Sequence, residues 1–226
     1  MTIDKFISKF KRKGVMGIVL LDDRLVIFKE KGARLGVKSR GKIKADGASI
    51  SYEVLEYEAA KQSMWAPTKK WLFSRAKILY DPRGKIKALI REKTKLSVKE
   101  RKWSITIGMV LSKMYSEYAK AWVAKGDLVS AHYCINVALD YLLEALFALN
   151  NQLCPDKRFI IHLAKQLKWV PNNFERNLSR ILTVELSIEG LKLRRDALNR
   201  LWKQMLPKAE RVIGAKFDQF KEAFVL

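Results

Sequence analysis

The chain has 226 residues, of which 49% are hydrophobic and 10% aromatic, and it contains only 11 glycines and 5 prolines. This composition excludes a disordered, collagenous or low-complexity protein, and the length suffices for one large or two small domains with their own core. The formal net charge of +22 predicts polyanions as partners.

Apolar runs in this sequence are short. None reaches the roughly 20 residues that a membrane-spanning helix needs, so no contact with a membrane is expected. The two cysteines, Cys134 and Cys154, are too few for a disulfide framework. We therefore expect a cytoplasmic protein.

The N-terminal half, residues 1–102, carries most of the charge, with 27 basic and 11 acidic residues. Apolar runs at 17–21 and 25–28 flank two aspartates and predict a hairpin of two strands. Segment 31–46 alternates glycines with lysines and arginines, which predicts an exposed basic loop or ribbon. Four further elements are predicted from the periodicity: a strand at 50–55, helices at 56–63 and 71–77, and a strand at 78–80 that ends in the turn 81–84.

The C-terminal half, residues 103–226, is predicted to be helical throughout. The helix 103–126 places large residues on one predicted face: Trp103, Ile107, Val110, Leu111, Met114, Tyr118 and Trp122. Asp127 is predicted to cap the next helix, which ends at Asn150. Further helices are expected at 158–167, at 172–183, and at 188–224, where Pro207 would leave one or two. The expected fold class is α+β, with a small mixed αβ domain over 1–102 and an all-α bundle over 103–226.

Two stretches give this order of elements a familiar character: ILYDPRGKI at the turn after the last strand, and GDLVSAHYCINVALDYLLEALFALNNQLCPDKRFIIHL in the helical half. The chain resembles the nucleotidyltransferase family that includes the minimal and aminoglycoside-type enzymes, over roughly residues 49–182. That resemblance implies a mixed catalytic sheet followed by a HEPN-like helical bundle.

The resemblance also implies a site made of a Gly-Ser loop, an Asp-x-Asp pair and a third carboxylate, which together hold two magnesium ions and a nucleoside triphosphate. Here Gly17 is followed by Ile18 instead of serine, so the phosphate loop is missing. Asp22 matches the first carboxylate and Glu53 the third, but Arg24 stands where the second belongs. The candidate catalytic residues are therefore Asp22, Asp23 and Glu53, as a vestigial set; the alternative for the aspartates is an ordinary turn.

The helical half offers weaker signals. Arg158 and His162 are similar to the Arg and His by which some HEPN domains cleave RNA, but only three residues separate them, and a coincidence on a helix surface is the alternative. His132 and Cys134 lie two residues apart, so they point to different sides of a helix. No metal site is predicted.

Basic residues form clusters in the N-terminal half that predict binding of a phosphate backbone. The candidate nucleic-acid-binding residues are Lys9, Lys11, Arg12, Lys13, Lys29, Lys31, Arg34, Lys38, Arg40, Lys42, Lys44, Lys69, Lys70 and Arg75. Trp65, Trp71 and Phe73 offer rings for stacking on unpaired bases, which would favour RNA; packing in the core is their alternative.

Three functions remain open on the sequence. The first is a catalytically degenerate nucleotidyltransferase fold, a pseudoenzyme, that binds nucleic acid, with RNA favoured over DNA. The second is an active nucleotidyltransferase, and only this one calls for a cofactor, Mg²⁺ with a nucleoside triphosphate. The third is a scaffold whose helical bundle pairs with a second copy or with another chain.

Overall fold

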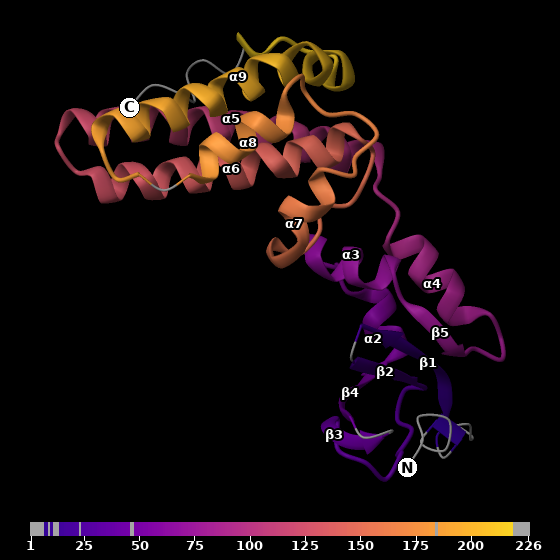
Figure 1. Ribbon diagram of the computed structural model, residues 1–226. Coiled ribbons are helices and arrows are strands. Elements are labelled where there is room, and N and C mark those ends of the chain that lie inside the picture. The colour runs from indigo at the N-terminus through magenta and orange to yellow at the C-terminus, as the bar shows by residue number, and fades with distance from the viewer. Residues whose placement is uncertain are drawn as a thin grey trace. The chain divides into compact units, whose positions relative to one another are not determined.

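The computed structural model describes residues 7–8, 10, 14–22, 24–45, 48–183 and 185–218. The chain divides into two compact units, Met1–Lys95 and Leu96–Leu226, both drawn in Figure 1. The predicted domain boundary at 102/103 falls inside helix α5 (Val98–Ala124). The helix starts earlier because Ser97 and Glu100 form a capping box, in which the Ser97 hydroxyl accepts from the Glu100 amide and the Glu100 carboxylate accepts from the Ser97 amide.

The first unit is built on a five-stranded mixed sheet. Its strands are β1 (Val15–Leu21), β2 (Arg24–Lys29), β3 (Arg40–Ala45), β4 (Ala48–Glu56) and β5 (Lys77–Tyr80), in the order β3-β4-β2-β1-β5. β2 and β4 pair in parallel, and the other neighbours are antiparallel. The predicted hairpin and both later strands are confirmed. The predicted basic ribbon is half loop and half strand, because its end pairs with β4 as the outer strand β3.

Both faces of this sheet are covered. On one face Ile18, Leu25 and Ile27 are buried together with Leu35 from the loop before β3. On the other face Val19, Val26 and Phe28 pack against buried residues of the helical segments, which are Ala60, Trp65, Phe73, Ile86 and Leu89. The central strands are consequently apolar on both sides, which explains their continuous apolar runs in the sequence.

The helices of the first unit are α2 (Tyr57–Gln62), α3 (Pro67–Ser74) and α4 (Lys85–Lys93). Pro67 starts α3, where its missing N–H costs no hydrogen bond. Helix α4 was not predicted. Its amides at Ile86 and Lys87 donate to the carboxylate of Asp81, 3.3 and 2.8 Å away, so the turn 81–84 leads directly into a helix.

Gly17 lies where β1 meets α4. A Cβ at this position would collide with the side chain of Ile86 and would come within 2.7 Å of the carbonyl oxygen of Tyr80. The glycine therefore allows helix and strand to approach closely. It is enclosed by the fold of the first unit, and β1 continues past it into β2 through a short turn.

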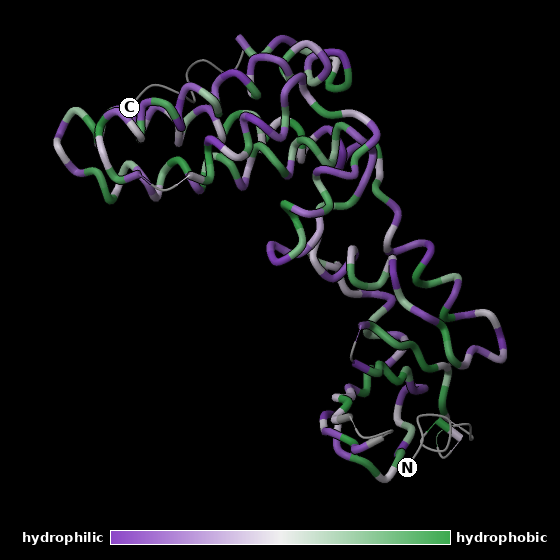
Figure 2. The backbone as a smooth tube through the Cα atoms, in the orientation of Figure 1, coloured by the Kyte–Doolittle hydropathy of each residue, from purple (hydrophilic) through white to green (hydrophobic). Residues whose placement is uncertain are grey.

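The second unit consists of α5, α6 (Leu128–Leu149), α7 (Lys157–Ala164), α8 (Phe174–Leu182) and α9 (Ile188–Ile213), in the part of the chain that the structure describes. Figure 1 shows α5 and α6 as a long pair joined by a short turn, and Figure 2 shows hydrophobic residues recurring along these helices. Asp127 caps α6 as predicted, since its carboxylate accepts from the amide of Ser130 at 2.9 Å. The predicted fold class, a mixed sheet followed by helices, is confirmed.

Helix α5 buries a face that coincides only in part with the predicted one. Its buried positions include Ile105, Gly108, Ser112, Ser116 and Ala119, whereas Trp103 is 66% exposed. Small residues occupy this face because α6 approaches closely: a Cβ at Gly108 would lie 2.7 Å from the carbonyl oxygen of Tyr141. Val110 is buried as predicted and Tyr118 is partly buried against the core, whereas Trp103 and Trp122 are exposed. The prediction was wrong for the two tryptophans because it assigned the largest residues to the core.

Two further features stabilise the helical unit. The guanidinium of Arg101 on α5 donates to the carbonyls of Ala148 and Leu149, at 2.9 and 3.1 Å, and so caps the C-terminal end of α6. Helix α9 continues through Pro207, which is exposed, so the carbonyl left without a helical partner can be hydrated. One helix therefore stands where one or two were predicted.

Helix α6 is the one described helix that is long and apolar enough to cross a membrane, and 61% of its apolar window is buried inside the unit. Its buried residues between Ala131 and Leu149 belong to the largest hydrophobic core. A core helix of this length passes the same test of length and composition. The burial accounts for its apolar character.

Candidate functional site

The two described candidate carboxylates lie apart along the sheet. Asp22 is exposed in the β1–β2 turn, with a positive φ of 48°, and Glu53 lies in the middle of β4. Strand register pairs Glu53 with Val26, four residues beyond Asp22, which corresponds to about 13 Å along a strand. Asp23 lies outside the described residues.

Glu53 is held by an arginine of the neighbouring strand. Nε and Nη2 of Arg40 on β3 both donate to its Oε1, at 3.0 and 2.6 Å. Its side chain is 20% exposed, against 80% for Arg40. Within the described part of the chain, no group of three or more His, Cys, Asp or Glu side chains is placed to hold a metal ion.

A pocket of about 500 Å³ surrounds this ion pair, at one end of the sheet face that carries Val26. It is lined by Arg24, Arg40, Gly41, Lys42, Ser51, Tyr52 and Glu53. Strand register explains how three cations meet here. Lys42 and Arg24 lie on either side of Ser51 in one row across β3, β4 and β2, and Arg40 lies in the next row, opposite Glu53. The pocket thus holds three cations and one carboxylate, which is already paired. This arrangement suits an anion and opposes a divalent metal.

Lys69 on α3 adds a fourth cation near Glu53. Burial lowers the pKa of Lys69, while the negative charge of Glu53 acts in the opposite direction. The ammonium lies 4.8 Å from the ring centre of Trp65 and 5.9 Å from that of Phe73. Cation–π contacts fix this lysine beside the pocket.

Next to the pocket, residues 31–44 form what we call the basic strip: the loop before β3 and most of β3 itself. The strip contains no acidic residue. Its six basic residues are all exposed: Lys31, Arg34, Lys38, Arg40, Lys42 and Lys44. On β3 the last three alternate with Gly41 and Ile43, so they project from one face of the sheet. On the opposite face the ring of Tyr52 packs over Gly41. A Cβ added at Gly41 would lie 2.6 Å from the hydroxyl of Tyr52.

The other predicted binding residues are divided by the structure. Lys29 is half-buried, and its ammonium already has two partners within the protein: it lies 3.3 Å from the Glu56 carboxylate and donates to the carbonyl of Ala33. Lys70 is half-buried, and the exposed Arg75 stacks on Trp71 with 5.1 Å to the ring centre. The remaining four, Lys9, Lys11, Arg12 and Lys13, lie outside the described residues.

Aromatic rings proposed for base stacking are in the core. Trp65, Trp71 and Phe73 are 2%, 7% and 4% exposed, so core packing, their alternative, holds for all three. Trp103 is an exposed ring that sequence reasoning missed, because it had assigned this residue to the buried face of α5. The signal was present in Lys99 and Lys102, which both precede Trp103 in the first turns of the helix, because a tryptophan that follows such a charged run is an unusual core residue.

Arg158 and His162 of the helical unit are each bonded to another partner. Arg158 pairs with Asp156 at 2.8 Å, and His162 lies 2.9 Å from the amide nitrogen of Gln166. His132 is instead bonded to the buried Arg194, with 2.6 Å between its Nδ1 and Nη1 of the arginine. Burial, followed by the charge of Arg194, lowers the pKa of His132 and favours the neutral imidazole.

No protein-family model and no curated protein matches this sequence. A solved structure does match: a nucleotidyltransferase-like protein from Exiguobacterium sibiricum 255-15, with a TM-score of 0.58 over 97% of this chain and 78% of that one. The two sequences are 11% identical, so the likeness concerns the fold. The chain accordingly has a nucleotidyltransferase-like α+β fold. The HEPN-like character of the helical unit stays a prediction.

Proposed function

We propose that this protein binds RNA through the basic strip and its pocket, on a nucleotidyltransferase-like fold that has given up nucleotidyl transfer. The observation that carries the proposal is the row of Arg24, Ser51 and Lys42, with the neighbouring Glu53 tied to Arg40. Cations stand where a metal site needs free carboxylates. A site with this charge attracts phosphate groups.

The shape of the basic strip suits a phosphate backbone. Arg40, Lys42 and Lys44 follow one another at two-residue intervals on one face of β3, about 6.6 Å apart. The glycines at 32 and 36 have positive φ angles of 75° and 63°, so the loop between β2 and β3 turns where it carries its cations. Such a row can contact successive phosphates of one strand.

RNA is favoured over duplex DNA because the cations lie on a loop and an outer strand. Reading the major groove of DNA usually takes a helix or a two-stranded ribbon, whereas RNA is recognised mainly at single-stranded or irregular regions. Under this proposal the protein works in the cytoplasm, where it meets RNA.

The test is a salt titration of RNA binding, followed by fluorescence anisotropy. The triple variant Arg40→Gln, Lys42→Gln, Lys44→Gln should lower the slope of log K against log salt by about two to three units, since each phosphate contact contributes somewhat less than one. A matched control removes three exposed charges of the helical unit, Lys168→Gln, Arg180→Gln and Lys203→Gln. Equal slopes for the two variants, or no RNA binding at low salt, would overturn the proposal.

An active nucleotidyltransferase is the second candidate, and the fold match favours it. The experiment is incubation with Mg²⁺, each labelled nucleoside triphosphate and total RNA. Transfer of label that is lost in Asp22→Ala or Glu53→Ala would establish it. Binding without transfer would support the first proposal.

Pairing of the helical unit with a second chain is a third candidate. Val129 and Tyr133 lie one turn apart on α6 and are 68% and 65% exposed, so they form an apolar patch on that helix. Light scattering at several concentrations would show a dimer. A dimer that is lost in Tyr133→Asp would locate the contact on this patch.

A further inference from the structure

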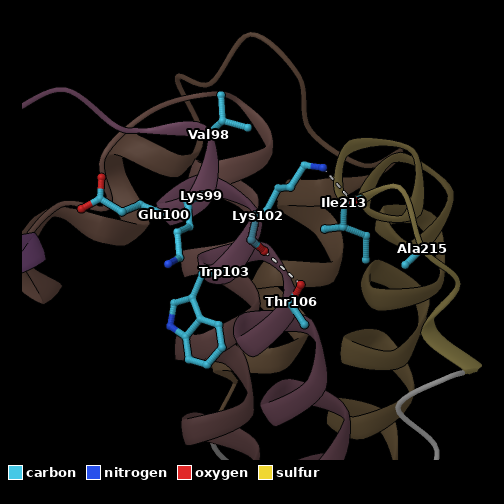
Figure 3. A pocket seen from close by; sticks show the side chains of 8 residues that line it. All are labelled: Val98, Lys99, Glu100, Lys102, Trp103, Thr106, Ile213 and Ala215. Atoms are coloured by element: carbon cyan, nitrogen blue, oxygen red, sulfur yellow. Dashed lines mark hydrogen bonds between the residues drawn. The ribbon is translucent and has the colours of Figure 1, made fainter.

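The start of helix α5 presents a tryptophan to solvent. The side chain of Trp103 is 66% exposed, although tryptophan is on average among the more buried residues. It lines an open groove of about 810 Å³ within the helical unit, shown in Figure 3. The remaining lining residues are Val98, Lys99, Glu100, Lys102, Thr106, Ile213 and Ala215.

Two lysines line the groove together with this ring. Lys99, one turn before Trp103, extends its ammonium toward the indole in Figure 3. Lys102 points to the other side, where its Nζ donates to the carbonyl of Ile213 at 3.1 Å. That bond uses one of three ammonium hydrogens and holds the charge at the groove.

The acid of the groove is occupied elsewhere. The carboxylate of Glu100 accepts from the amide and the hydroxyl of Ser97, at 3.1 and 2.9 Å, in the capping box of α5. It points away from Trp103 in Figure 3. The charge beside the exposed ring is therefore positive, and the groove combines an apolar floor with a cationic rim.

We propose that this groove binds an unpaired nucleotide of single-stranded RNA, with the base stacked on Trp103 and the adjoining phosphates beside Lys99 and Lys102. The inference rests on the proposed function and adds to it a second binding point and a class of substrate. Stacking on an aromatic ring requires a base with a free face, which single strands offer and duplexes do not. Lys99 extends toward the ring and Lys102 lies farther along the groove, so the two cations can contact phosphates next to a stacked base.

The test compares oligouridine of about 12 nucleotides with a duplex RNA of equal length, by fluorescence anisotropy at fixed salt. Trp103→Ala should weaken binding of the single strand by roughly tenfold and leave duplex binding within about twofold. Trp103→Phe, which keeps a ring, should retain most of the affinity. Trp122→Ala is the matched control on the same helix, because the ring of Trp122 is 37% exposed and Lys125 already lies over it at 5.0 Å.

The outcomes separate this inference from the proposed function. If RNA binds but Trp103→Ala matches the control, or weakens both ligands equally, the stacking site is wrong and the basic strip is unaffected. If Trp103→Ala weakens the single strand while the β3 triple variant changes nothing, the groove stands and the strip is wrong. If neither RNA binds at low salt, both are wrong. Circular dichroism of each variant verifies that the helices are intact.

Discussion

Arg194 on α9 is a buried guanidinium, 2% exposed, and its replacement by methionine gives a sharp test of how the helical unit is held together. Its Nε donates to the carbonyl of Ile181 at 2.6 Å, and Nη2 donates to the Oδ1 of Asn136 at 2.8 Å. Nη1 lies 2.6 Å from Nδ1 of His132. One side chain thus joins α9 to α6 and to the last turn of α8.

The magnitude follows from what Arg194→Met leaves behind. The buried carbonyl of Ile181 and the half-buried side chains of Asn136 and His132 lose a charged partner, and these three losses together cost about 4 kcal/mol. No carboxylate is among the hydrogen-bond partners of Arg194 in the described part of the unit, so removing its buried charge returns about 1 kcal/mol. The net loss in free energy of unfolding is about 3 kcal/mol.

Thermal denaturation followed by circular dichroism measures this loss. For a unit of this size, about 3 kcal/mol corresponds to a Tm lowered by roughly 10 °C. The control is Lys203→Met, an exposed position of the same helix, which should shift Tm by less than about 2 °C. A loss below about 1 kcal/mol in Arg194→Met would refute the reasoning, because the three bonds would then only compensate the burial of the charge.

Three further predictions concern pH, packing and cysteine chemistry. Because the pKa of His132 is lowered in the folded state, its neutral form supports stability above the unfolded pKa of about 6.5, and this support is lost on acidification. The difference in Tm between the native protein and His132→Gln should therefore shrink between about pH 8 and pH 5; a constant difference would contradict this. Gly108→Ala should lower the free energy of unfolding by about 1–2 kcal/mol despite the better helix propensity of alanine, and a gain in Tm would show that α5 and α6 can move apart freely. Burial, followed by the charges of Glu144 and Asp140, raises the pKa of Cys154 to about 12, so its thiol should resist iodoacetamide at about pH 8 until the protein is denatured, as intact mass would show.

Local patterns in the sequence predicted most elements of the fold. The hairpin, β4 and α6 follow from apolar runs and stripes that a single segment contains. Helix α4 was not predicted because it is short and five of its nine residues are charged, although Ile86, Leu89 and Ile90 have the helical spacing. The buried face of α5 escaped for the opposite reason, since small residues that pack closely leave no hydrophobic signal.

The candidate site was less predictable. The sequence shows Arg24 as the break in the carboxylate pattern, and its basic clusters include Arg40 and Lys42. Their meeting in one pocket depends on the pairing of β3 with β4 and of β4 with β2, and no local pattern specifies that register. The pairing of Glu53 with Arg40 depends on the same register, because Arg40 lies directly opposite Glu53 on the neighbouring strand.

Strand β3 is one of the two outer strands of the described sheet, and its outer edge offers unpaired backbone groups to any other extended chain. Positive charges at every second residue of such a strand discourage edge-to-edge association between copies of a protein. Under the proposed function, Arg40, Lys42 and Lys44 therefore protect the edge of the sheet from association as well as bind RNA. A chain in which they are neutral would be prone to strand addition and aggregation, especially at high concentration. Ligand affinity and colloidal behaviour are thus coupled through the same three side chains, and a variant that exchanges lysine for arginine on β3 would preserve both.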